Sequence, residues 1–138
     1  VLRCSDVHYR YIDSTSIRYV DKKISEQYSR TILKGGEVLV NIRGTLGGCA
    51  IADKNVIGYN IAREVAMIPI SPYIYNNFIL DIISSPYFQR MISSNLRGIA
   101  YKGLNLNILS NLLIPLPTLT EQKRIVAKIE ELMLLNFI

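Results

Sequence analysis

Cysteine and histidine are scarce in this sequence. Its 138 residues include two cysteines, Cys4 and Cys49, which form no CxxC pair, and one histidine, His8, which has no companion ligands at metal-site spacing. Zinc sites and disulfide frameworks need several such residues at regular spacing. The sequence therefore predicts neither a metal centre nor a disulfide framework, and unpaired cysteines fit a reducing cytoplasm.

Long hydrophobic runs are missing as well. No apolar run approaches the length of a membrane span, and the start of the chain has no charged-then-apolar signal segment. A hydrophobic content of 49% and nine tyrosines exclude a disordered chain. The length suits one domain with an appendage. We expect a folded cytoplasmic protein with no membrane partner.

The motifs of common enzyme classes are incomplete. GTLGG at 44–48 lacks the Lys-Ser/Thr of a phosphate-binding loop, so a hairpin turn is the better interpretation, with anion binding by its N–H groups left open. SSPYF at 84–88 has one proline where the amino-methyltransferase signature has two, and no GxG-type cofactor loop follows a strand. No GxSxG elbow is present. The sequence predicts no catalytic residue and no cofactor.

Positive charge is concentrated before the C-terminal segment. The net charge is +5, and residues 118–138 carry three basic and three acidic residues. Residues 1–117 therefore hold the whole excess, with 13 basic and 8 acidic residues. A basic body favours an anionic partner, and a neutral helix favours a protein partner.

Local patterns divide the chain into a strand-rich first half and a helical second half. Tyrosine, isoleucine and valine in residues 8–21 and the runs 37–42, 49–52 and 64–70 predict strands, with glycine-rich turns at 35–36 and 44–48. Ser-Pro-Tyr at Ser71 and at Ser85 predicts two successive helices, because serine caps a helix and proline suits its first position. A short helix is expected over 105–112. The predicted class is α+β: a mixed, sheet-rich N-terminal half, short helices, then a C-terminal amphipathic, coiled-coil-like helix.

The C-terminal helix is predicted to begin at Thr118. Thr118 and Glu121 match a capping box, and two preceding prolines keep the approach extended. Its heptad seam contains Gln122, Ile125, Ile129, Leu132 and Asn136, with Val126 and Met133 beside it. Such a stripe packs either on the chain's own core or on a partner helix. We expect the helix to be a separate unit that dimerises through Ile125, Ile129, Leu132 and Met133.

Three stretches together resemble the specificity subunit of type I restriction–modification systems. They are YSRTILKGGEVLVNIRGTLGGCAI, LRGIAYKGLNLNILSNLLIPLP and LPTLTEQKRIVAKIEELM. The last is the most specific, because a proline-rich exit, Glu-Gln and a basic-apolar helix are how that family joins a target recognition domain to its spacer helix. Glu37 follows a double glycine where the family usually has Gly-Asp.

The resemblance implies two parts and a non-catalytic role. Residues 1–117 would be a DNA target recognition domain lacking its start, and residues 118–138 the beginning of the spacer or dimerisation helix. With no initiator methionine and no C-cap, we expect a piece of a longer chain or a half-subunit. In the family, each domain reads one half of a split double-stranded DNA target, and the spacer helices pair and dock methyltransferase subunits. Methyl transfer and cleavage belong to those subunits and to the motor–nuclease subunit.

Candidate DNA contacts follow from charge and loop position. Base readout is expected from Arg43 and Thr45 on the hairpin and from Arg97, Tyr101 and Lys102 in the glycine-rich loop, because arginine can bond guanine bidentately. Phosphate contacts are expected from Lys22, Lys23, Lys54 and Arg63. A solvated surface charge is the alternative for each residue outside the two glycine loops.

Two other functions compete with DNA recognition. One is a scaffold or assembly module that acts through its C-terminal helix. The other is an RNA-binding module, which lacks support because the tyrosines are scattered and form no aromatic pair on adjacent strands.

Overall fold

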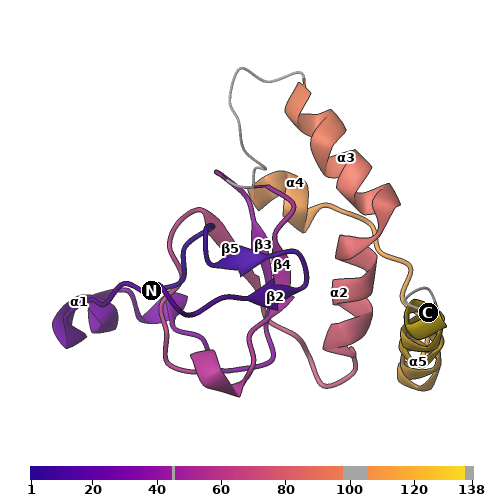
Figure 1. Cartoon of the computed structure of the whole chain (residues 1–138), viewed down its shortest axis with the longest axis horizontal. Helices are drawn as coiled ribbons and strands as arrows, with labels where there is room; N and C mark the ends of the chain where they lie inside the picture. The colour runs from indigo at the N-terminus through magenta and orange to yellow at the C-terminus, as the bar shows by residue number, and fades with distance from the viewer. Residues whose placement is uncertain (45, 98–105, 136–138) are drawn as a thin grey trace.

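The structure, a computed structural model, describes residues 1–44, 46–97 and 106–135 (Figure 1). Its elements lie in the order sheet, helix α2, helix α5, with α5 separated from the sheet by α2 (Figure 1). Two small antiparallel sheets and several short helices confirm the α+β class. No described helix is long and apolar enough to cross a membrane.

The elements are, in chain order, β1 (Val7–His8), β2 (Tyr11–Ile12), α1 (Lys22–Gln27), the 3-10 helix η1 (Ser29–Thr31), β3 (Val38–Asn41), β4 (Cys49–Ile51), the 3-10 helix η2 (Lys54–Val56), β5 (Val65–Ile68), α2 (Asn76–Ser84), α3 (Pro86–Arg97), α4 (Leu106–Ser110) and α5 (Leu119–Leu135).

Strand β3 is the centre of the body. It pairs antiparallel with both β4 and β5, and all four of its residues are buried. Because side chains alternate along a strand, Val38 and Val40 join the cluster that packs on α2. Leu39 points to the other face and joins a second cluster with Leu2 and Leu33. A strand covered on both faces explains why the run 37–42 is almost continuously apolar.

The predicted turns around β3 are confirmed. The buried Glu37 carboxylate accepts hydrogen bonds from the backbone N–H groups of Lys34 (2.8 Å) and Gly35 (2.7 Å), so it closes the turn that precedes the strand. Gly44 and Gly47 have φ values of 70° and 89°, in the left-handed region that favours glycine. The segment 44–48 thus joins two antiparallel strands as a hairpin connection.

Two local predictions are wrong. The stretch 8–21 contains only the second residue of strand β1 and the two-residue strand β2, and the helix α1 directly after it was not predicted. The helix expected at Ser71 begins at Asn76: Ser71 instead accepts from the N–H of Ile74 in a turn (3.1 Å). The Tyr75 N–H at the start of α2 donates to the Gln122 side chain of α5 (2.7 Å). A distant residue therefore binds the first backbone donor of this helix.

The later helices begin as predicted. The Ser85 hydroxyl accepts from the N–H of Phe88 (3.3 Å), which caps α3. The Thr118 hydroxyl accepts from the N–H of Glu121 (3.3 Å) at the start of α5. The Glu121 carboxylate accepts from Arg124 (2.6 Å), so the reciprocal half of the capping box is replaced by an ion pair.

Helix α5 is not separate from the body over its first turns. Gln122 is 0% exposed and Val126 2%, and Ile125 packs against the cluster that contains α2. The two prolines before the helix therefore do not isolate it, because the backbone reverses onto α2 and the stripe finds apolar partners there. Further along, Leu132 is 48% exposed.

Candidate nucleic-acid interface

Two of the predicted DNA-contacting residues lie on neighbouring strand ends. Arg43 follows β3, and Arg63 lies just before β5, which pairs with β3 in the register Asn41↔Val65. The N–H groups of Ile42 and Arg43 donate to the Glu64 carbonyl, at 2.9 and 3.4 Å. Both arginines are exposed at the end of the sheet that carries the hairpin. Thr45 lies outside the described residues.

Helix α3 approaches the same hairpin. A Cβ built on Gly47 would lie 3.4 Å from Oε1 of Gln89, so the connection between β3 and β4 passes beside the first half of α3. Both features lie toward the upper end of the molecule in Figure 1. Arg97 is the last residue of α3, and nothing of its side chain is described. Tyr101 and Lys102 lie outside the described residues.

The predicted phosphate contacts do not share one surface. Lys54 lies in η2, after β4, at the end of the sheet opposite the hairpin. Lys22 and Lys23 lie on α1, which projects away from the sheet (Figure 1). Lys22 is 4.0 Å from Glu26 at its own helix, a weak surface pair. Among these residues, only Arg63 lies at the hairpin end.

Helix α1 is held by a polar anchor that the sequence did not reveal. The Asn60 side chain accepts from the Ser25 hydroxyl (2.6 Å) and donates to the Thr31 hydroxyl (2.9 Å), and Asn60 is 7% exposed. This anchor fixes a six-residue helix that buries no residue of its own. No local signal could have identified it, because Asn60 is 35 residues from Ser25.

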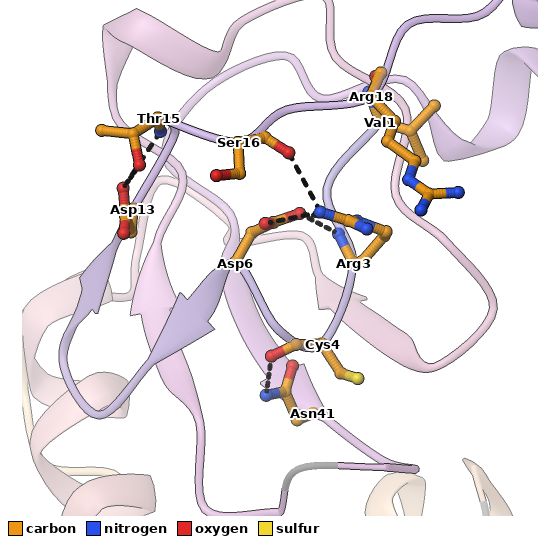
Figure 2. A network of polar contacts seen from close by, with 9 residues as sticks. All are labelled: Val1, Arg3, Cys4, Asp6, Asp13, Thr15, Ser16, Arg18 and Asn41. Carbon is orange, nitrogen blue, oxygen red and sulfur yellow. Dashed lines mark hydrogen bonds and ion pairs between the residues drawn. The ribbon is translucent and has the colours of Figure 1, made fainter.

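The N-terminal segment forms hydrogen bonds with the last residue of β3, where the β3–β4 hairpin begins. The buried Asn41 side chain donates to the carbonyl of Cys4 at 2.9 Å (Figure 2). It also donates to the carbonyl of Val7 at 2.9 Å. Arg3 pairs with Asp6 (3.3 Å) and donates to the Ser16 carbonyl (3.0 Å) in the same network (Figure 2). Asn41, two residues before Arg43, is therefore tied to the N-terminal segment by hydrogen bonds.

A buried ion pair joins the β1–β2 hairpin to α2. Arg10 lies 2.8 Å from Asp81, whose side chain is 6% exposed, and it also donates to the Ser84 hydroxyl (2.5 Å). Burial raises the pKa of the Asp81 carboxyl, the guanidinium of Arg10 opposes that shift, and Glu130 on α5 adds to it. Arg10 has a φ of 70°, which costs strain in a non-glycine residue. The ion pair uses Oδ1 of Asp81, whereas Oδ2 is buried without a hydrogen-bond partner. The pair therefore ties the β1–β2 hairpin to α2 inside the body.

The residues expected at a subunit interface separate along α5. Ile125 packs on the body, and Ile129 is partly buried. Leu132 and Met133 are 48% and 39% exposed, and Leu134 and Leu135 are more exposed still. The first half of the apolar stripe of α5 is therefore buried against the chain's own body, and its second half remains at the surface.

Arg90 on α3 was missed as a candidate DNA contact, whereas Arg97 and Lys102 were named. No acidic residue occurs between Asp81 and Glu121, whereas Arg90, Arg97 and Lys102 all lie there. The signal was present in the sequence as a run without carboxylates. Its meaning needed the structure, which places Arg90 on the exposed side of a helix beside the hairpin.

The described residues thus form a small α+β body with exposed arginines at one end and a helix docked through its first turns. Residues 3–136 match the model of the type I restriction modification DNA specificity domain. The chain therefore belongs to this family.

Individual relatives agree with that assignment. The chain is 35% identical over 133 residues to the type I restriction enzyme EcoBI specificity subunit of Escherichia coli, covering 96% of this chain and 28% of the relative. The HsdS subunit of Thermoanaerobacter tengcongensis matches with a TM-score of 0.59 and 25% identity, over 74% of this chain and 23% of that one. A chain in a solved structure concerning the type I R-M system shares the fold, with a TM-score of 0.63 and 19% identity over 96% of this chain and 30% of that one. This chain thus spans less than a third of the length of each relative.

Proposed function

We propose that this chain recognises double-stranded DNA in a sequence-dependent manner, as one target recognition domain of a type I specificity subunit. It reads one half of a split target and catalyses nothing itself. Residues 1–117 form the recognition domain, and residues 118–138 begin the spacer helix. The observation that carries the proposal is the basic end of the body, where Arg43 and Arg63 lie on neighbouring strand ends at the hairpin, in a chain of this family.

The roles of the two parts follow from their surfaces. Arginine side chains at the hairpin end suit base edges and phosphates, whereas the lysines on α1 and η2 suit phosphates only if the DNA extends past those elements. The exposed distal half of α5 suits a second helix and the methyltransferase subunit, through which the motor–nuclease subunit joins the complex. Where a second spacer helix is lacking, a second copy of this chain takes its place and forms a homodimer.

Salt dependence tests the DNA-binding role. The chain should bind randomised duplex DNA weakly, because a half-site offers few contacts, and the logarithm of the affinity should fall linearly as the logarithm of salt rises. Selection from the random pool should return one short asymmetric motif. Absence of duplex binding at low salt, or an affinity that salt leaves unchanged, would contradict the proposal.

A scaffold that acts through α5 is the second candidate, and the exposure of Leu134 (69%) and Leu135 (59%) favours it. The two candidates differ in one measurement. A scaffold would associate through α5 and show no motif in the DNA selection, whereas a recognition domain should return a motif even when α5 association is blocked.

A further inference from the structure

We propose that the outer face of α3 is a DNA-backbone contact, with Arg90 and Tyr87 as the residues that bind a phosphate. The inference rests on the proposed function and extends it, because it assigns the side of the body that meets DNA and adds two residues outside the glycine loops.

Helix α3 has one buried and one exposed face. Phe88 and Ile92 are 3% and 4% exposed and pack into the main cluster. Tyr87 is 71% exposed, and Arg90 is exposed three residues later, on the same side of the helix. The helix is fixed in this rotation by the Ser85 cap and by the Gln89 amide, which donates to the Ile83 carbonyl (2.7 Å).

The stretch of chain that carries this face contains basic residues and no acidic ones. Five basic side chains elsewhere form ion pairs with carboxylates: Arg3, Arg10, Lys22, Arg124 and Lys128. Within the described part of the chain, Arg90 has no carboxylate partner. The sequence around it supplies none, since residues 82–120 contain no aspartate or glutamate. An ordinary solvated helix face mixes both signs, whereas an acid-free basic face attracts polyanions.

The position of the face connects it to the other basic residues. The hairpin passes beside Gln89, so Arg43 and Arg90 lie at the same end of the body. Arg97 follows Arg90 by seven residues, which is two helical turns. A phosphate held near the first half of α3 would thus lie at the same end of the body as the hairpin that carries Arg43.

The chemistry of the two side chains suits a phosphate. Arginine offers several N–H donors to phosphate oxygens, and the tyrosine hydroxyl donates one more hydrogen bond to them. A phosphate contact positions the protein without reading sequence. Arg90 and Tyr87 should therefore affect affinity equally for all sequences.

The test compares Arg90→Ala and Arg90→Lys in the complete chain, by affinity for random and selected duplexes over a salt series. Arg90→Ala should weaken binding of every duplex by about tenfold, as expected for one charge-assisted hydrogen bond, and should reduce the slope of log affinity against log salt by about 0.9. Arg90→Lys should restore the slope. Tyr87→Phe should weaken binding but should leave the slope of log affinity against log salt unchanged. The selected motif should stay the same in all variants.

Lys128→Ala is the matched control, because it removes one exposed positive charge from α5 at a distance from the hairpin. Thermal unfolding establishes that each variant is folded. Equal affinity and slope for Arg90→Ala and the control would overturn the inference while leaving the proposed function in place. A changed motif would overturn the phosphate assignment. A wild-type chain that binds no duplex would instead refute the proposed function.

Discussion

Gln122 is the residue whose replacement tests most directly how α5 is attached. Its Oε1 accepts from the Tyr75 N–H (2.7 Å), and its Nε2 donates to the Pro117 carbonyl (2.9 Å) and, at longer range, to the Tyr73 carbonyl (3.4 Å). The side chain is completely buried. Gln122→Met keeps nearly the same volume and shape and removes every one of these hydrogen bonds.

The expected cost follows from the two short hydrogen bonds. The loss of each bond leaves a partly buried backbone group without a partner, and such an unpaired group costs about 1–3 kcal/mol of stability. The 3.4 Å contact adds little, because it lies at the limit of hydrogen-bond geometry. Gln122→Met should therefore lower the free energy of unfolding by about 2–6 kcal/mol, a large share of the 5–15 kcal/mol typical of a domain.

Urea unfolding measures this change, and the midpoint should fall for Gln122→Met with little change in slope if the protein stays two-state. Gln27→Met is the matched control, because it makes the same substitution at an exposed position on α1. That control should stay within about 0.5 kcal/mol of the wild type. A Gln122→Met variant as stable as the control would refute the view that this amide fixes α5 to the body.

Gln122→Glu separates hydrogen-bond direction from volume. A carboxylate would accept from Tyr75 but would face the Pro117 carbonyl without a donor, so ionisation should be unfavourable in the folded state. The variant should be strongly destabilised at neutral pH and should regain stability as the pH falls and protonation restores a donor. A loss of stability that does not vary with pH would contradict this account.

Three further predictions concern other contacts. Arg10→Ala should lower the free energy of unfolding by about 3–5 kcal/mol at neutral pH, because it leaves the Asp81 carboxylate buried without its cation. Since the pKa of Asp81 is raised, its protonation favours the folded state, and urea unfolding should show a smaller loss of stability in acid. A loss that does not vary with pH would contradict this account. Gly48→Ala should lower the free energy of unfolding by about 3 kcal/mol or more, since a Cβ would overlap the buried Asn41 amide on β3 and the Val7 carbonyl of β1. Gly58→Ala meets no atom within 4 Å and should lose only the cost of its positive φ, about 1–2 kcal/mol, so equal losses would exclude steric overlap as the cause. Leu132→Lys should leave stability within about 0.5 kcal/mol and convert a homodimer into a monomer in sedimentation, and a wild-type chain that sediments as a monomer at high concentration would exclude the dimer.

Local sequence determined the elements whose signals lie within a few residues. The strands at 38–41 and 49–51 and the hairpin between them follow from two short, mainly apolar runs separated by a glycine-rich turn. The caps at Ser85 and Thr118 were predictable because a hydroxyl and the N–H it binds are three residues apart. The family resemblance likewise rests on contiguous motifs.

Tertiary structure alone decided how these elements meet. The start of α2 depends on Gln122, 47 residues away, and the position of α1 depends on Asn60. Whether α5 stands apart or docks could not be inferred from its stripe, since an apolar face is the same for a core and for a partner. The sequence also could not show which basic residues lie together. The antiparallel pairing of β3 and β5 places Arg43 beside Arg63 and leaves Lys54 at the opposite end of the sheet. A sequence specifies which side chains seek partners within one or two turns, whereas the packing of distant segments selects which partners they find.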